Sequence, residues 1–139
     1  MPTTQRLKRG NEFNRLHRDH YPYQEVRLEY TDRLGRHRQV RVDSYDPFHG
    51  EIVERKFTQL SEIKEQTAKR YIDQLANKYQ PGTKILDVPS NHAGLRGRLL
   101  EGTQILEVPV QKKSIPKSIL DYANEKGIII RDTAGQVYN

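Results

Sequence analysis

Apolar and polar residues alternate in two neighbouring stretches of the first third of the chain. From Gln24 to Tyr30 every second residue is apolar, as in a strand with one buried face. After a turn over residues 32–35, the same alternation returns from Val40 to Asp43. These segments predict a β-hairpin. A third strand is predicted from Glu51 to Phe57, after the break formed by Asp46, Pro47 and Gly50.

Apolar residues recur every three or four positions in two later segments, which predicts helices. The first follows the third strand: Ser61 can cap a helix whose apolar stripe runs from Ile63 to Tyr79 and which ends near Pro81 and Gly82. The second begins at Pro116 and runs to Lys126, where Gly127 ends it.

The remaining segments complete the predicted order of elements. Residues 4–20 fit a helix interrupted near Gly10 and Asn11. The octapeptide GTKILDVP at 82–89 returns as GTQILEVP at 102–109 with six of eight positions identical, and each copy predicts a short strand ended by proline. A last buried strand is predicted at 128–130. The pattern therefore predicts an α/β (α+β) fold with the order α-β-β-β-α-β-β-α-β.

Composition and charge narrow the partners. The chain has 139 residues, which suits one domain with a single core. Lys and Arg number 24 against 18 Asp and Glu, giving a net charge of +6 that favours a polyanionic partner such as nucleic acid. The same charge is also compatible with solubility alone.

Several classes of protein are excluded. The chain has no cysteine, which rules out disulfides, thiolate catalysis and cysteine zinc sites, and the five histidines lack paired zinc-ligand spacing. Residues 1–9 lack the apolar core of a signal peptide, and the aliphatic run at 128–130 is too short to cross a bilayer. We expect no contact with a membrane.

The candidate chemistry lies on the third strand. Side chains alternate along a strand, so Glu54 and Lys56 share one face. In an antiparallel hairpin, one plausible register sets Asp43 opposite Ile52 and diagonal to Glu54, on that same face. Asp43 and Glu54 would then be the ligands of Mg²⁺ or Mn²⁺, with Lys56 orienting a water or stabilising the transition state. Asp46 is the substitute ligand if that register is wrong.

Asp43, ten intervening residues and then Glu54-Arg55-Lys56 form a pattern that resembles the D…E-x-K signature of the PD-(D/E)XK, or restriction-endonuclease-like, nucleases. The resemblance covers residues 4–88. It implies a restriction-endonuclease-like core with a central mixed sheet flanked by helices, and a metal-dependent endonuclease activity. The sequence departs from the family where Val42 replaces a proline that often precedes the aspartate.

Further residues enter through this resemblance. Gln66 and Tyr71 look similar to a glutamine and an aromatic residue that members carry on the helix after the third strand, which implies a catalytic Gln66. Gln66 can also be an exposed helix residue, and Tyr71 belongs to the apolar stripe. Glu12 is the candidate for a glutamate that some members use on the first helix. The domain division implied is one nuclease domain over 1–139, with a helical segment at 1–22, a catalytic core at 24–88 and a C-terminal extension at 91–139.

A second resemblance concerns residues 45–63 and the segment LEVPVQ that ends at Gln111. Both are similar to the C-terminal nuclease domains of bacterial polymorphic (contact-dependent) toxins used in interbacterial competition. This implies release from a larger secreted toxin, action in the target-cell cytoplasm, and a cognate immunity protein as partner.

Basic residues are the candidates for binding nucleic acid, with DNA favoured over structured RNA: Arg70, Arg96, Arg98, Lys112 and Lys113. Two alternatives remain open. One is a metal-independent ribonuclease that uses His49 or His92. The other is a non-catalytic basic module in which Glu54 and Lys56 are solvated residues of an exposed sheet face.

Overall fold

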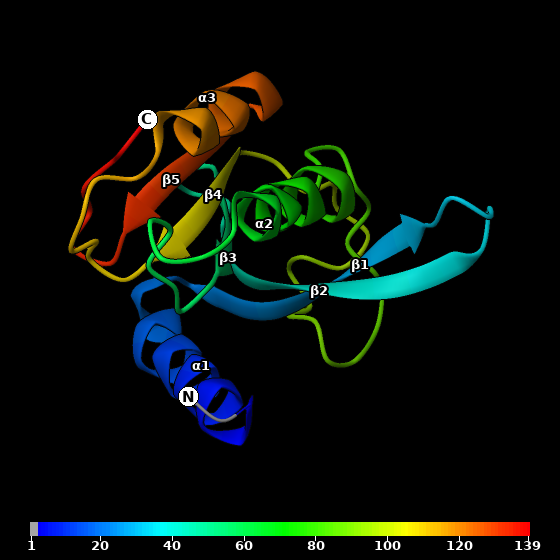
Figure 1. The fold of residues 1–139 in the computed structure, drawn as a ribbon. Helices are drawn as coiled ribbons and strands as arrows, with labels where there is room; N and C mark the ends of the chain where they lie inside the picture. Colours follow the sequence, from blue (N-terminus) through cyan, green and yellow to red (C-terminus); the bar gives the residue numbers. More distant parts are fainter. Residues whose placement is uncertain (1–2) are drawn as a thin grey trace.

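A five-stranded mixed sheet forms the centre of the computed structural model, which describes residues 3–139 (Figure 1). The strand order across the sheet follows the chain: β1 (Tyr23–Thr31), β2 (His37–Asp46), β3 (Glu51–Arg55), β4 (Thr103–Val108) and β5 (Ile128–Asp132). The β1–β2 and β2–β3 pairs are antiparallel, whereas the β3–β4 and β4–β5 pairs are parallel. Residues 1 and 2, which belong to the predicted N-terminal segment, lie outside the described part.

Three helices flank this sheet: α1 (Thr3–His17), α2 (Glu65–Lys78) and α3 (Lys117–Lys126). A 3₁₀ turn at Arg18–His20 follows α1. Figure 1 shows α2 and α3 beside each other along the sheet, with α1 set apart at the other side of β1 and β2. Parallel neighbours need a long crossover connection, and α2 and α3 supply it for the β3–β4 and β4–β5 pairs. The predicted α/β class is confirmed.

The main core lies between the sheet and the helices α2 and α3. It contains Ile52 of β3, Leu106 of β4 and Ile72 of α2, all fully buried. The buried amide of Gln104 also donates to the carbonyl oxygens of Leu75 and Tyr79, at 2.8 and 2.9 Å. The Leu75 carbonyl also accepts the N–H of Tyr79 at 3.2 Å, and Tyr79 is the residue that follows α2. The side chain of Gln104 therefore ties the C-terminal end of α2 to β4.

Predicted helix boundaries were right at α3 and partly wrong elsewhere. Pro116 precedes α3, and Gly127 ends it in the left-handed conformation with φ of 72°, as predicted. The helix α1 runs through Gly10 without interruption. Ser61 does not cap α2, because the helix begins at Glu65, and the Ser61 hydroxyl is buried without a partner among the described residues.

The predicted strand at 82–89 was wrong, although its near-copy at 102–109 forms β4. The segment makes only isolated bridges, one of them between Ile85 and Leu28 at the edge of β1. Beyond Leu86, the buried side chain of Asn91 takes over this edge by bonding both the N–H and the carbonyl of Arg27. A side chain therefore satisfies the backbone groups that a longer strand would have paired.

Asp132 organises the turn at the end of β5. Its carboxylate, 2% exposed, accepts hydrogen bonds from the N–H groups of Ala134 and Gln136 and from the Tyr138 hydroxyl. Burial alone would raise the pKa of Asp132, but these hydrogen bonds hold it below its ordinary value. The stabilisation from the charge is thus present above the ordinary pKa of about 4 and is lost as the pH falls through the lower folded pKa.

We predict that Asp132→Asn lowers the free energy of unfolding by about 1–2 kcal/mol at pH 7, because three bonds to a charged acceptor become bonds to a neutral one. Urea denaturation at a series of pH values measures this difference. The gap between variant and wild type should close below about pH 4. Asp121→Asn on the exposed face of α3 is the control. A gap that stays constant with pH would contradict the assigned role of the charge.

Candidate functional site

The register of β2 against β3 decides which acidic residues meet. Tyr45 lies opposite Ile52, and Ser44 opposite Val53. The predicted register, with Asp43 opposite Ile52, was therefore wrong by two residues. An even shift keeps each side chain on its face of the sheet, so Asp43 stays on the same face as Glu54 and now lies directly beside it.

Two hydrogen bonds link β2 to β3 at Asp43 and Glu54, and in each of them a carboxylate accepts a backbone N–H of the facing strand. The N–H of Asp43 donates to Oε1 of Glu54 at 2.9 Å, and the N–H of Arg55 donates to Oδ2 of Asp43 at 2.9 Å. Side chains thus take the place of the backbone ladder where β2 and β3 separate. Each carboxylate uses one oxygen for a backbone N–H, which holds it in place and leaves its second oxygen for another partner.

The neighbouring strand β1 is distorted at the same position. Glu25 has a φ of 46°, in the left-handed region that non-glycine residues rarely occupy. The pairs on either side, Gln24 with Ser44 and Val26 with Val42, keep one register, but no pair joins Glu25 to Asp43. Such strain costs about 1–3 kcal/mol and gathers at functional sites. Here it lies across from Asp43.

Two largely buried carboxyl groups lie close together on the sheet, and each has a shifted pKa. Burial, and next the charge of Asp43, raise the pKa of Glu54 well above its ordinary value; burial is also the main cause that raises the pKa of Asp43. The pKa of Tyr79, a buried residue at the end of α2, is raised by burial and then by the charges of Glu54 and Asp43. A bound cation would relieve this repulsion.

Lys56 completes the predicted trio. It lies one residue beyond the end of β3, where its N–H still donates to the carbonyl of Glu107 at 3.0 Å. Its ammonium lies 5.1 Å from the centre of the Tyr71 ring of α2, a cation–π contact, and its charge lowers the pKa of both carboxyls. Tyr71 packs against the core as predicted and also positions Lys56.

Two residues that entered through the family resemblance are not brought to the trio. Gln66 is exposed, and five helical positions place it about 140° around α2 from Tyr71. Glu12 is exposed on α1, with a long ion pair to Arg15 at 3.9 Å. Gln74 lies three residues after Tyr71 and therefore on the same side of α2. Helical spacing in the sequence alone would have indicated Gln74, and not Gln66, as the glutamine on the side of Tyr71.

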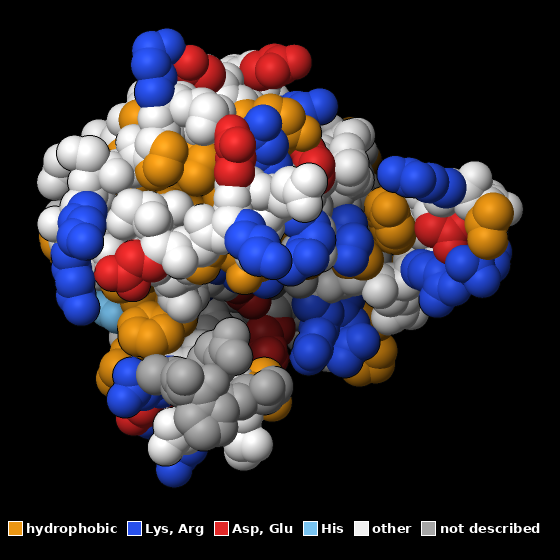
Figure 2. All heavy atoms as spheres, in the orientation of Figure 1, with side chains coloured by type: hydrophobic (Ala, Val, Ile, Leu, Met, Phe, Trp, Pro, Cys, Tyr) orange, Lys and Arg blue, Asp and Glu red, His pale blue; other side chains and the backbone are white. Residues whose placement is uncertain are grey.

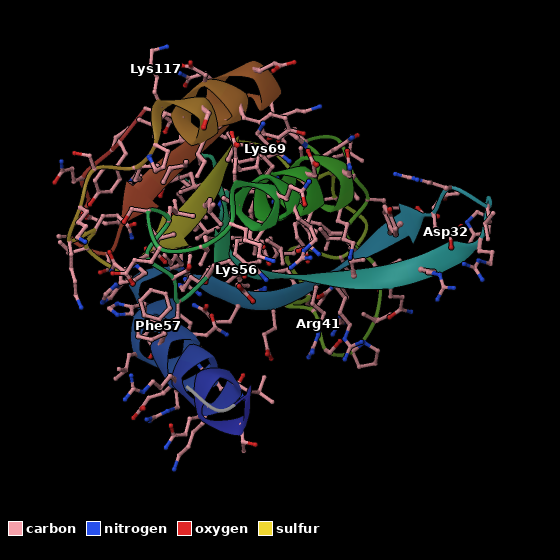
Figure 3. The ribbon with its side chains drawn as sticks, in the orientation of Figure 1. Asp32, Arg41, Lys56, Phe57, Lys69 and Lys117 are labelled. Carbon is pink, nitrogen blue, oxygen red and sulfur yellow. The ribbon has the colours of Figure 1, made fainter. Side chains whose placement is uncertain are left out.

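Basic side chains lie on one side of a recess that contains acidic groups. Figure 2 shows acidic side chains at the bottom of this recess below α2, with Lys and Arg side chains above it and to its right. Arg70 is exposed and contacts the Tyr71 ring at 6.0 Å. Arg41 was missed by sequence reasoning: it lies two residues before Asp43, pairs with Glu25 at 3.8 Å, and appears on the same side of the molecule as Lys56 in Figure 3.

The other predicted basic residues have different surroundings. The Arg96 guanidinium donates to the carbonyl oxygens of the 88–91 segment, which fastens its own loop. Arg98 is exposed beside a small pocket that Tyr45 lines. Lys112 and Lys113 are exposed in the loop after β4. The N–H of Lys112 donates to Oε1 of Gln59 at 2.9 Å, which joins this loop to the segment that follows Lys56.

Asp46, the substitute ligand, lies at the other end of the β2–β3 pair, opposite Glu51. Its carboxylate accepts hydrogen bonds from the N–H groups of Phe48 and His49 and contacts Nδ1 of His49 at 2.7 Å. It therefore holds the turn between the strands, as an aspartate at the start of a turn commonly does. The structure places Asp43, and not Asp46, beside Glu54.

The histidines of the ribonuclease alternative lie in two loops outside the strand segments that carry Asp43 and Glu54. His49 is exposed in the β2–β3 turn, beside a pocket on the sheet face opposite α2 that Tyr21 and Arg131 also line. His92 accepts a hydrogen bond from the N–H of Gly94, and its ring lies 5.3 Å from that of Tyr23. The two histidines have different neighbours: His49 contacts the Asp46 carboxylate, and His92 packs beside the Tyr23 ring.

Residues 3–139 contain no group of three or more His, Asp or Glu side chains arranged to hold a metal, so a metal would have two protein carboxylates here. In the same part of the chain, no helix combines the length and the apolar character needed to cross a membrane. Comparison with protein-family models, with curated proteins and with solved structures finds no match.

Proposed function

We propose that this chain is a metal-dependent endonuclease that hydrolyses phosphodiester bonds, with DNA favoured over structured RNA. The observation that carries the proposal is the pair of Asp43 and Glu54, each fixed by a backbone N–H at 2.9 Å, with the Lys56 ammonium on the same face. Two fixed carboxylates and one ammonium are the groups that metal-assisted hydrolysis at a phosphate requires.

The donor set suits a hard divalent cation. Mg²⁺ takes oxygen ligands and is commonly bound by one or two carboxylates together with substrate phosphate, so Asp43 and Glu54 are a sufficient protein contribution. Burial raises the pKa of both residues, and the charge of Asp43 raises the pKa of Glu54 further; a bound cation would offset both effects. Mg²⁺ or Mn²⁺ would lower the pKa of a bound water and reduce the charge on the scissile phosphate.

The chain's own residues account for orientation and charge. Lys56, held by Tyr71, presents a positive charge where negative charge grows on the phosphate. Arg41, two residues before Asp43 on β2, and Arg70, which contacts the Tyr71 ring, are exposed and can bind flanking phosphates without reading sequence. The net charge of +6 favours a polyanion as substrate.

The biological setting is also a proposal. The similarity of residues 45–63 and of the segment ending at Gln111 to polymorphic-toxin nucleases supports a role as the toxic domain of a larger secreted bacterial protein. In that setting the domain acts in the target-cell cytoplasm and a cognate immunity protein blocks it in the producer. Each of these two segments contributes a glutamine, Gln59 and Gln111, whose side chain forms hydrogen bonds to the other segment. These bonds join the loop after β3, which begins at Lys56, to the loop after β4.

The test is cleavage by the purified chain of plasmid DNA and of tRNA, with Mg²⁺ or with EDTA. We expect cleavage with Mg²⁺, none in EDTA, and recovery when Mg²⁺ is added in excess. Cleavage that persists in EDTA would identify the metal-independent ribonuclease instead, and binding without cleavage would identify the non-catalytic module.

Melting temperature gives a second readout that does not depend on activity. At a Mg²⁺ concentration about 100-fold above its Kd, binding to the folded state adds about 2.7 kcal/mol and should raise Tm by about 8 °C. Glu54→Gln should remove this rise. An equal rise in Tm in the wild type and in Glu54→Gln would mean that Mg²⁺ binds at a different site.

A further inference from the structure

The outer part of the β1–β2 hairpin, residues 30–39, projects from the body of the molecule and is called the arm below (Figure 1). The free edge of β1 is covered only as far as Glu29, whose N–H donates to the carbonyl of Lys84 at 3.0 Å. Beyond this point the two strands pair with each other and contribute no residue to the core among those described. Core packing therefore does not explain the arm's length.

The tip of the arm is held in one shape by the carboxylate of Asp32. Its Oδ1 accepts the N–H groups of Leu34 and Arg36, and its Oδ2 accepts Nε of Arg36 and of Arg38, all at 2.9–3.0 Å. These bonds lower the pKa of Asp32 to about 2, so the carboxylate is charged at neutral pH. The tip is therefore preorganised before any partner binds, which reduces the conformational entropy lost on binding.

The arm is basic and exposed. Its ten residues contain three arginines, Arg33, Arg36 and Arg38, against the single acid Asp32. All three arginines are exposed, and Figure 2 shows Lys and Arg side chains gathered at this end of the molecule. Leu34 at the tip is 75% exposed, an apolar side chain that the fold does not use.

We propose that the arm enters the major groove of duplex DNA while the site at Asp43 and Glu54 lies beside the phosphate backbone, which a cation bound there would contact. The proposal rests on the nuclease function proposed above and adds its substrate class, double-stranded DNA. Two strands about 4.8 Å apart, with their side chains, fit a groove about 12 Å wide. The major groove of A-form RNA is too narrow for such a ribbon, which favours DNA.

One strand links the arm to the site. From Arg38 to Asp43, β2 runs without interruption, a length of about 17 Å at 3.4 Å per residue. Arg41 lies between them and is exposed, so positive charge extends from the tip towards the acidic pair. A rigid strand of this length can set a fixed separation between the groove contact and the cut phosphate.

The experiment measures binding in the 139-residue chain carrying Glu54→Gln, without metal, so that cleavage plays no part. Fluorescence anisotropy would record Kd for duplex DNA, single-stranded DNA and duplex RNA of one sequence, as a function of salt. The arm variant is Arg33→Gln with Arg38→Gln, which removes the bond of Arg38 to Asp32 and leaves the three bonds from Leu34 and Arg36 to hold the tip. The matched control, Lys117→Gln with Lys126→Gln, removes the same charge from exposed positions of α3.

We expect the arm variant to weaken duplex DNA binding about 10-fold or more and to lower the salt slope by about 2, with little change on single strands. The α3 control should bind as the parent does. A second variant, Leu34→Asp, keeps the backbone bond to Asp32 but brings negative charge to the tip, and should also weaken duplex binding.

Equal losses in the arm variant and the α3 control, equal losses on single and double strands, tighter binding of duplex RNA, or no duplex binding by the parent would each overturn the proposal. These outcomes are independent of the cleavage test. A chain that cuts DNA but binds it without the arm retains the proposed nuclease function and loses only this inference.

Discussion

Glu54→Gln should reduce the rate of Mg²⁺-dependent DNA cleavage by about 1,000-fold, equivalent to about 4 kcal/mol of transition-state stabilisation. The amide keeps the oxygen that accepts the N–H of Asp43, so the hairpin should remain intact. It removes one of two negative ligands of the cation. Initial rates on supercoiled plasmid measure the loss.

The control for this variant is Glu125→Gln, which removes a carboxylate from the exposed face of α3. Its activity should equal that of the wild type. The cleavage rate of Asp43→Asn should fall as far as that of Glu54→Gln. The rate of Lys56→Ala should fall by about 100-fold, because Lys56 contributes charge stabilisation alone. Full activity in Glu54→Gln would rule out the proposed site, whatever the other variants do.

Glu107→Gln should lower the free energy of unfolding by about 3–5 kcal/mol. Glu107 of β4 is 3% exposed and accepts Nε of Arg55 at 2.5 Å and the Tyr21 hydroxyl at 2.9 Å. The Arg55 guanidinium also donates to Asn14 of α1 and to Ser44 of β2. Removing the carboxylate leaves a buried positive charge without its counter-ion. Urea denaturation measures the change, which is a large share of the 5–15 kcal/mol typical of a domain.

Glu51→Gln provides a matched comparison, because Glu51 also pairs with an arginine, Arg131 at 2.5 Å, on the same face of the sheet. This pair is partly exposed, with side chains 19% and 23% accessible, so water can solvate the remaining charge. We expect a loss of only about 1 kcal/mol. Similar losses in both variants would mean that burial does not control the cost.

Local sequence patterns predicted most of the elements. Alternation marked β1 and β2, the recurrence of apolar residues marked α2, and Pro116 with Gly127 marked the ends of α3. Each of these signals depends on residues within a few positions of one another. The interpretation failed at 82–89, because the partner that ends the pairing there is Asn91, a contact between segments.

The candidate site divides in the same way. Alternation along β3 set Glu54 on the face of Ile52, and that much needs only the sequence. Local patterns carry no register, so the placement of Asp43 beside Glu54 depended on the pairing of Tyr45 with Ile52. The choice between Asp43 and Asp46 likewise depended on the hydrogen bonds that hold Asp46 in its turn.

The sequence by itself determined the mixed α/β class, the face that Glu54 occupies and the positive charge that favours a polyanion. The tertiary structure alone decided that Asp43 is the partner of Glu54, that Tyr71 holds Lys56, that Gln66 lies away from both, and that the β1–β2 hairpin extends as a basic arm. The physical reason is range: periodicity and charge are properties of neighbouring residues, whereas register, cation–π contact and exposure arise only when distant segments pack.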